Sequence, residues 1–420
     1  MLRANSFFRS KVIRQLSGAL VFSIVGRLLQ VLLAILLTRE LGVVQYGVFV
    51  LIYATAQILQ QISSLGIPVA SMRVIPEYLE ENKSSYLRGF LLFSILAILF
   101  TTVILATLLL LLSIYFEWSI YKYTNVVQFW AVLFGLTALQ LKKRQFSTVD
   151  RNAEGVFWEI VFPFLIVNFV IMIVGIQNIF SLLSLLGCSF LSSFAIASLR
   201  LRWNLSGIER AYLIGNWIKH SLPFLLSFGA RDLMNRVDVL VLAPIAGVGQ
   251  VGLYTAAFKI VFLITFPQNI LNSVMSSRFA RAHSSGNKFR LRRLLLLSYV
   301  ITVATVLPMS FSLLYDPAFV ITIMFGEEFR DASKILEILV YAQIAITVVT
   351  PLIVMLNMTG VERTIAKINM VTLSVLLLLC VFFAVRLEGQ GVAWARMIAF
   401  ILLGSLVIAQ FRKHWEGLYK

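Results

Sequence analysis

The residues of this sequence that could do chemistry lie within its apolar stretches. The segment SFGARDLMNRVDVLVLAPIAG, residues 227–247, carries Arg231, Asp232, Arg236 and Asp238 in a run long enough to cross a bilayer. An ionised side chain near the bilayer centre costs roughly 2.5–3.5 kcal/mol on insertion scales, so such charges usually face a protein interior or a water-filled path. The segment therefore predicts either a site for a charged ligand or a set of buried ion pairs.

Basic side chains outnumber acidic ones inside the apolar stretches. The five that we select are Arg27, Arg231, Arg236, Lys259 and Arg396, against the two aspartates Asp232 and Asp238. An arginine guanidinium presents a planar fork of N–H donors that fits phosphate oxygens. The excess of bases therefore predicts an anion-attracting lumen. For Lys259 and Arg396 the alternative is snorkelling, in which the side chain reaches the membrane surface.

The spacing of the charges in residues 227–247 predicts two polar strips on one helix. Arg231, Asn235 and Asp238 recur at i, i+4 and i+7, whereas Asp232 and Arg236 lie at i and i+4 and could pair with each other. Asp232 and Asp238 are the candidate carriers of a coupling proton or cation, because burial favours a neutral carboxyl while a nearby arginine favours the ionised one. Service as a plain counter-ion is the alternative for both.

A second polar pattern lies on the stretch that follows the first apolar run. Tyr53, Gln57, Gln60 and Gln61 recur at i, i+4, i+7 and i+8 on a segment that is otherwise apolar. Because unsatisfied amides are costly in lipid, this stripe should line either a cavity, where it could bond to sugar hydroxyls, or a seam between helices.

The composition sets the class of protein that must position these residues. The 420 residues are 60% hydrophobic and 13% charged, and the mean hydropathy is +0.90. This is more apolar than one soluble core can hide, so we predict an all-α, polytopic integral membrane protein. Runs long enough to cross ~30 Å of hydrocarbon number about twelve. They are residues 17–38, 46–66, 88–114, 126–141, 156–176, 178–199, 219–245, 251–272, 292–314, 332–357, 363–385 and 389–411.

The net charge of +17 is explained by membrane orientation and does not indicate nucleic acid. With twelve spans both termini share one side, and the segments on that side hold 26 of the 36 Lys and Arg residues, against five on the other side. The positive-inside rule therefore places both termini in the cytoplasm.

The two halves of the chain resemble each other at an offset of 205 residues. This offset aligns residues 40–49 with 245–254 and pairs Gly42 with Gly247 and Gly47 with Gly252. We therefore predict two six-helix domains, 1–205 and 206–420, that enter the membrane the same way up and enclose a central cavity. The same offset places Arg27 opposite Asp232 and Gln30 opposite Asn235, so both residues of the first helix are candidates for the cavity lining.

The stretch from Gly18 to Pro76, above all RELG-x-x-x-YG-x-F and LGIPVASMR, resembles the bacterial polysaccharide flippases that translocate O-antigen and capsule repeat units. These proteins belong to the multidrug/oligosaccharidyl-lipid/polysaccharide exporter superfamily. The resemblance implies alternating-access transfer of a polyprenyl-diphosphate-linked oligosaccharide from the inner to the outer leaflet of the bacterial cytoplasmic membrane. The partners it implies are that lipid-linked glycan, membrane lipid, H+ or Na+, and the polysaccharide polymerase and chain-length machinery.

Other classes of function find less support in the sequence. No GxxxxGK[ST] segment is present, the three histidines have no metal-ligand spacing, and we expect neither enzymatic activity nor a cofactor. An ion-coupled multidrug exporter of the same superfamily is the nearest alternative, but a pocket for organic cations should be rich in acids. A membrane-embedded glycan polymerase or glycosyltransferase would need paired acids at an interface, for which only the outer segment GEEFRD, residues 326–331, qualifies.

Overall fold

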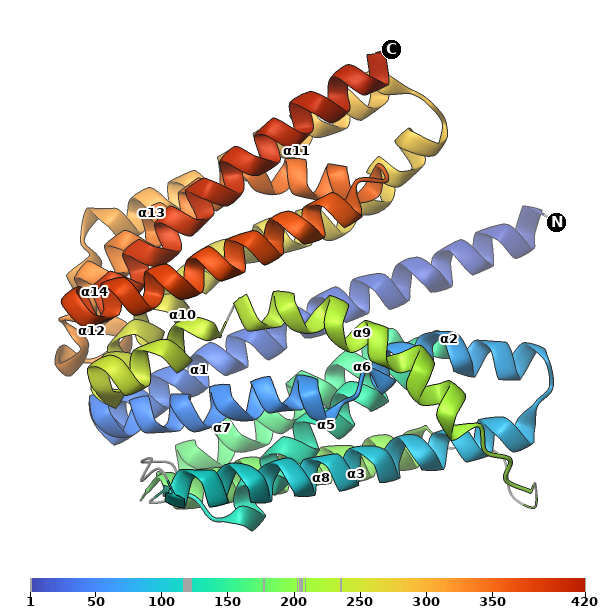
Figure 1. Ribbon diagram of the computed structural model, residues 1–420, viewed down its shortest axis with the longest axis horizontal. Helices are drawn as coiled ribbons and strands as arrows, with labels where there is room; N and C mark the ends of the chain where they lie inside the picture. Colours follow the sequence, from blue (N-terminus) through green and yellow to red (C-terminus); the bar gives the residue numbers. More distant parts are fainter. Residues whose placement is uncertain are drawn as a thin grey trace. The chain divides into compact units, whose positions relative to one another are not determined.

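The computed structural model describes residues 2–115, 123–176, 178–201, 203, 207, 209–234 and 236–419, and places side chains in these ranges except at 2–16, 223–224, 226–232 and 416–419. Every regular element within the described ranges is a helix (Figure 1). The predicted all-α fold is therefore confirmed. By its internal contacts the chain divides into two compact units, a first unit of Met1–Leu41 with Ile52–Leu233 and a second unit of Gly42–Leu51 with Met234–Lys420.

The first unit is built mainly from the N-terminal helices. They are α1 (Leu2–Ser63), α2 (Ile67–Glu80), α3 (Ser84–Tyr115), α5 (Val126–Thr148), α6 (Asn152–Val156), the π-helix η1 (Phe157–Val161), α7 (Phe162–Val174), α8 (Ile179–Arg200) and α9 (Ile214–Met234). Helix α5 packs on α2, α3 and α8. The start of α9 joins this core through Trp217, whose indole N–H donates to the Tyr78 hydroxyl at 2.9 Å.

The second unit contains the remaining helices. They are α10 (Val237–Ser284), α11 (Lys288–Tyr315), α12 (Pro317–Phe325), the short 3₁₀ turn η2 (Glu327–Phe329), α13 (Ala332–Met358) and α14 (Glu362–Tyr419). Helix α13 packs on α10, α11 and α14. The residues 206–233 belong to the first unit and 42–51 to the second, and the predicted repeat domains stay predictions.

Three of the helices are broken where the sequence predicts the end of one membrane span and the start of the next. The helix α1, with 62 residues, contains Gly42 at φ 69°, α10 contains Gly247 at φ 83°, and α14 contains Glu388 at φ 50°. An unbroken helix as long as α1 would measure roughly 90 Å, three times the hydrocarbon thickness. Figure 1 shows the two halves of α14 running back alongside each other, and Phe383 lies against Gly391 across this reversal.

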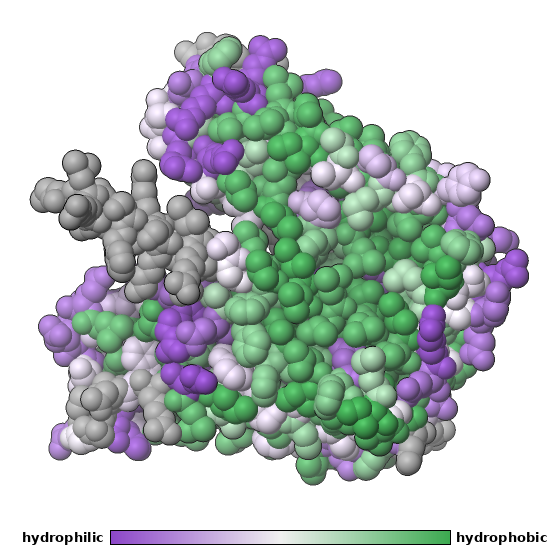
Figure 2. Space-filling view, turned by 180° about the vertical axis from the view of Figure 1, so that it is seen from behind, coloured by the Kyte–Doolittle hydropathy of each residue, from purple (hydrophilic) through white to green (hydrophobic). Residues whose placement is uncertain are grey.

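Among the described residues, eight helices are long and apolar enough to cross a membrane, and the count of twelve stays a prediction. Helix α3 shows the membrane pattern in its two faces. Its exposed side chains include Leu96, Phe100 and Val103, whereas Ser94 and Thr102 are buried. A helix whose exposed face is apolar and whose buried face carries hydroxyls has the reverse pattern of a helix in a soluble protein. This pattern suits contact with lipid. Figure 2 shows broad apolar surface with hydrophilic side chains at its margins.

Two predicted spans differ from the helices observed. Helix α5 continues from the predicted end at residue 141 to Thr148, so Lys142, Lys143 and Arg144 are helical residues and not a loop. The predicted span 219–245 is not one helix, because α9 ends at Met234 and α10 begins at Val237. The single helical face predicted for Arg231, Asn235 and Asp238 is therefore wrong.

Within the second unit, the part of α1 after Gly42 crosses α10 at two glycines. A Cβ built on Gly47 would lie 1.8 Å from the carbonyl oxygen of Val248, and one built on Gly252 would lie 2.4 Å from the carbonyl oxygen of Val43. Real Cβ atoms do not approach an oxygen this closely, so neither position accommodates a side chain without a shift of the backbone. Glycine here permits direct contact between two helix backbones.

Candidate functional site

The first unit brings three charged side chains together. The Lys143 ammonium on α5 lies 2.6 Å from a carboxylate oxygen of Glu159 on η1, and Arg27 on α1 interacts electrostatically with the same Glu159. The exposed fractions of the Lys143 and Glu159 side chains are 27% and 18%, and Arg27 is half-buried. We call these three residues the first charge cluster. It holds two bases for one carboxylate and is partly accessible.

The π-helix positions the carboxylate of this cluster. Phe162 donates its backbone N–H to the carbonyl of Phe157, five residues earlier, so the turn that contains Glu159 is wider than an α-helical turn. Such π-bulges are frequent at functional sites. Helix α1 approaches this turn closely at Gly26, because a Cβ there would lie 2.4 Å from Cγ2 of Ile160.

Two further contacts fix α1 against this region. The Phe22 and Phe157 rings meet edge to face with centroids 5.3 Å apart, and the Asn168 side-chain amide donates to the carbonyl of Leu29 at 3.0 Å. Since these contacts lie before and after Arg27, they fix the part of α1 that carries Arg27 against η1 and α7. The geometry therefore belongs to rigid helices and not to a loop.

Sequence reasoning missed two members of this cluster. Glu159 lies inside the predicted span 156–176 but was not among the acids weighed against the five bases. Lys143 was expected in a cytoplasmic loop, and the extension of α5 carries it to Glu159 instead. A single acid within FWEIVFPF was the available signal, since a carboxylate in an apolar run needs a partner.

The second unit contains a buried group that joins α10 to α14. Arg396 Nε lies 3.0 Å from Oδ2 of Asp238, with only 5% and 2% of the two side chains exposed. The Tyr254 hydroxyl donates to the same carboxylate oxygen. We call Asp238, Tyr254 and Arg396 the second charge cluster. Unlike the first cluster it balances one base with one carboxylate and is closed to solvent.

The second charge cluster also contacts the break between α9 and α10. Arg396 Nη2 donates to the carbonyl of Met234, the last residue of α9, at 3.2 Å. The last carbonyls of a helix have no partner within it, and a cation at that end is favoured by the helix dipole. The guanidinium also lies over the Phe258 ring, 4.6 Å from its centroid. Arg396 is therefore held inside the unit and does not snorkel.

The remaining predicted residues with described side chains lie on α1, at the start of α10 and within α10. The Gln60 side chain donates to the carbonyl of Leu136 on α5 at 3.1 Å, so it lies in a helix seam, the alternative given for this stripe. Six predicted residues are half-buried, namely Gln30, Tyr53, Gln57 and Gln61 on α1, Arg236 directly before α10 and Lys259 within α10. Asn235 and the side chains of Arg231 and Asp232 lie outside the described residues.

The helical units have the long apolar helices of a polytopic membrane protein, and solved structures of such proteins share their fold. A lipid II flippase, MurJ, in an inward closed conformation matches with a TM-score of 0.72 over 93% of this chain and 87% of that chain, at 14% identity. An inward-facing multidrug resistance MATE family transporter of the MOP superfamily matches with a TM-score of 0.73 over 97% and 99%, at 13% identity. At these identities the likeness establishes the fold alone.

A third solved structure of the same superfamily has a similar fold. It is a transporter from Pyrococcus furiosus, described as having a binding pocket of reverse polarity, with a TM-score of 0.62 over 98% of this chain and 96% of that chain, at 14% identity. No curated protein sequence matches the chain significantly.

The family is shown by sequence. The profile of the family described as "Polysaccharide biosynthesis protein" matches residues 14–279, more than half of the chain. The protein therefore belongs to the polysaccharide biosynthesis protein family and is a multi-pass membrane protein with the fold of flippases and transporters of the MOP superfamily. The solved structures that match are described as flippases and transporters.

Proposed function

We propose that this protein moves a polyprenyl-diphosphate-linked oligosaccharide from the inner to the outer leaflet of a bacterial cytoplasmic membrane, for surface polysaccharide biosynthesis. Membership of the polysaccharide biosynthesis protein family and the fold shared with a lipid II flippase support this substrate class. In this proposal the glycan lipid would then pass to a polymerase and its chain-length machinery on the outer side.

The observation that carries the proposal is the excess of positive charge in the first charge cluster. Lys143 forms an ion pair with the single carboxylate of Glu159, and Arg27 interacts electrostatically with the same carboxylate. An ion pair that is partly exposed contributes about 1 kcal/mol or less. A diphosphate, which brings more negative charge and more acceptor oxygens than one carboxylate, can therefore displace Glu159 from both bases at small cost.

This exchange suggests how binding and release alternate. With substrate present, the diphosphate would take the donors of Arg27 and Lys143, and Glu159 would be free to move away on its π-turn. Return of the carboxylate would compete with the phosphate and release it on the outer side. Because substrate and Glu159 use the same donors, the site contains its own competitor and avoids binding the anion too tightly to let go.

The proposed two-domain architecture, 1–205 and 206–420, provides a framework for alternating access. Gly42 and Gly247, paired by the repeat, have similar backbone angles, with φ 69°, ψ −179° and φ 83°, ψ 168°. The contacts at Gly47 and Gly252, also paired by the repeat, are reciprocal. These matches support, at the level of backbone geometry, the internal repeat that the sequence predicts.

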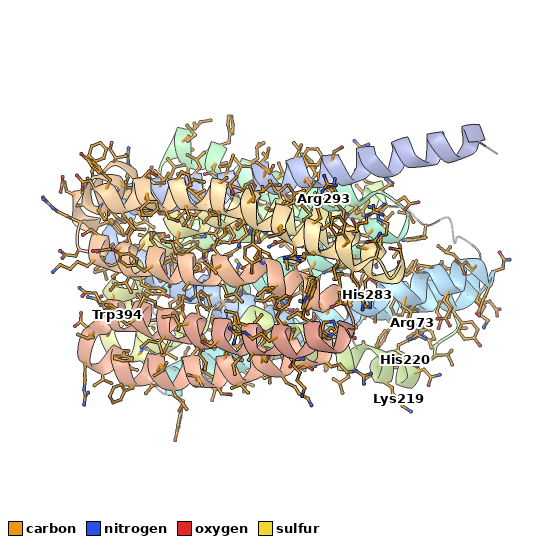
Figure 3. The ribbon with its side chains drawn as sticks, turned by 90° about the horizontal axis from the view of Figure 1, so that it is seen from above. Arg73, Lys219, His220, His283, Arg293 and Trp394 are labelled. Atoms are coloured by element: carbon orange, nitrogen blue, oxygen red, sulfur yellow. The ribbon has the colours of Figure 1, made fainter. Side chains whose placement is uncertain are left out.

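The distribution of basic residues supports cytoplasmic termini. In the first unit Arg73, Lys219 and His220 lie at one end, and in the second unit Arg293 and His283 lie at one end while Trp394 lies towards the other (Figure 3). We propose that these basic ends face the cytoplasm, in accordance with the positive-inside rule.

The test is flipping of a fluorescent polyprenyl-diphosphate glycan in vesicles that contain the purified protein. Loss of one charge-assisted hydrogen bond costs about 1.5–3 kcal/mol, so Arg27→Ala and Lys143→Ala should each lower the rate at limiting substrate about tenfold or more. Lys83→Ala is the matched control, because Lys83 also pairs with a carboxylate, Glu81 at 2.7 Å, but both are about half exposed. Wild-type rates for both test variants would refute this site.

A multidrug exporter remains the second candidate function, and the partly exposed carboxylate of Glu159 together with the MATE fold favours it. The variant Glu159→Gln separates the two. If the cargo is a diphosphate, the amide no longer competes for the bases, so uptake into the site should persist or strengthen. If the cargo is an organic cation, removal of the carboxylate should abolish extrusion of fluorescent cations such as ethidium.

A further inference from the structure

The second charge cluster unites two residues to which the sequence assigned different partners. Asp238 was a candidate carrier of a coupling ion, and Arg396 was a candidate ligand for the anionic substrate. In the structure Arg396 Nε lies 3.0 Å from the Asp238 carboxylate, and both side chains are buried. Arg396 therefore takes the position expected for the coupling ion of Asp238, and Asp238 takes the position expected for the anionic substrate of Arg396.

The contacts of Arg396 leave it committed to this place. One edge of the guanidinium faces the Asp238 carboxylate and Nη2 donates to the carbonyl of Met234. The guanidinium lies over the Phe258 ring of α10, and its carbon is 5.5 Å from the centroid of the Phe400 ring on α14. An arginine held by a carboxylate, a helix end and aromatic rings cannot turn towards a soluble or lipid anion without breaking all of these contacts.

A carboxylate buried in an apolar helical unit must be neutralised, and three means exist: a proton, a bound metal cation, or a fixed base. The titratable and charged side chains placed against Asp238 include Tyr254 on α10 and Cys380 and Arg396 on α14. Of these three only the guanidinium carries positive charge, and arginine keeps it at every physiological pH.

We infer that Arg396 is a tethered counter-ion that fills the cation position of Asp238, so that this carboxylate exchanges neither Na+ nor a proton during transport. The role of Arg396 is that of a positioning residue: it fixes the charge of Asp238 and ties α14 to the end of α9. Any ion coupling in this protein must then use other groups.

The inference rests on the proposed transport function only in its transport measurement, since ion binding to the protein can be measured without substrate. The primary assay is the melting temperature of the purified full chain in detergent, in NaCl and in choline chloride, and at two pH values. We expect the wild-type melting temperature to be the same in both salts, because no exchangeable cation is bound at Asp238.

The test variant is Arg396→Met, which keeps the length of the side chain and removes its charge. Asp238 should then recruit an outside cation, so Na+ or a lower pH should raise the melting temperature by about 3 °C or more. The double variant Asp238→Asn with Arg396→Met removes both charges and should lose this response. Arg386→Met is the matched control, because Arg386 also lies on α14 and 4.6 Å from a phenylalanine ring centroid, but is exposed.

Two results would overturn the inference. One is a wild-type protein that Na+ or acid stabilises through Asp238, shown by loss of the response in Asp238→Asn. The other is a folded Arg396→Met protein that responds to neither cation. If Arg396→Met gives no folded protein while the double variant does, the uncompensated carboxylate is the cause and the inference holds. If neither folds, the wild-type measurement alone decides.

A transport measurement completes the test. If the flipping rate of the glycan lipid differs between Na+ vesicles and vesicles in which choline replaces Na+ on both sides, the same relative difference should persist in Asp238→Asn, because the ion would act at another site. Failure of every lipid-linked glycan in the flipping assay would refute the proposed function and leave the melting results unaffected, so the two failures are distinguishable.

Discussion

The contact of the two helix backbones at Gly47 and Gly252 gives a prediction with a magnitude. In Gly47→Ala the new methyl group would lie 1.8 Å from the Val248 carbonyl oxygen. Real Cβ atoms keep at least 3.0 Å, so α1 and α10 must separate by 1.2 Å, the difference between 3.0 and 1.8 Å. Overpacking of this kind costs about 1–3 kcal/mol.

The substitution also brings a gain, because alanine favours a helix over glycine by about 1 kcal/mol. We therefore expect Gly47→Ala to lose roughly 0–2 kcal/mol in net stability, while Gly249→Ala should gain up to about 1 kcal/mol. Gly249 is the matched control, since it lies on α10 beside the same crossing and a Cβ there would meet only Val44 Cγ2, at 4.0 Å.

The assay is thermal unfolding of both variants in one detergent, followed by flipping in vesicles. Both variants gain the same helix propensity from alanine, so the difference between their free energies of unfolding isolates the contact. This difference should be about 1–3 kcal/mol. We expect flipping to fall in Gly47→Ala, since a forced separation alters the contact about which these helices can pivot. Equal melting temperatures for the two alanine variants would refute direct backbone contact at Gly47.

Three further predictions concern single contacts. Tyr78→Phe removes the buried acceptor of the Trp217 indole N–H, and should destabilise the first unit by about 1–3 kcal/mol; a melting temperature equal to that of wild type would contradict the bond. Glu388→Gly relieves a left-handed residue at φ 50° and should stabilise by up to about 1–2 kcal/mol, whereas a loss in urea or thermal unfolding would mean that the Glu388 side chain matters. Gly26→Val places methyl groups on Ile160, so it should displace α1 from the π-turn and lower flipping, and wild-type flipping would count against the tight approach.

The sequence predicted the fold class and the places where the long helices break. Hydropathy sets the spans, and glycine accounts for the breaks at Gly42 and Gly247, because only glycine adopts their φ values easily. The break between Met234 and Val237 was not predicted, since no glycine or proline marks it. It is stabilised by Arg396, a residue far along the chain, through the Met234 carbonyl.

The charge clusters show why site residues were harder to predict than the fold. Asp238 and Arg396 were both selected as polar residues in apolar stretches, but their pairing depends on the packing of α10 against α14, which periodicity does not encode. Similarly, periodicity found the stripe that contains Gln60 but not the helix it faces, which is α5. Charge and spacing identify residues that need partners, and tertiary structure supplies them.

The buried hydroxyls of α3 have a consequence for motion. Ser94, Thr102 and Ser113 each donate to a carbonyl of their own helix, those of Phe90, Ile98 and Leu110, at 2.6, 2.7 and 2.8 Å. For these bonds a neighbouring helix supplies no donor or acceptor, so it can slide or rotate along this face without breaking them. Between helices, the Thr101 hydroxyl of α3 donates to the carbonyl of Ser63 on α1 at 2.8 Å. A movement of α1 along α3 therefore has to break this bond, whereas the hydroxyls of Ser94, Thr102 and Ser113 keep theirs and add only dispersion contacts, which re-form at each new register. In the proposed transport cycle, resistance to such a movement would then be concentrated at Thr101.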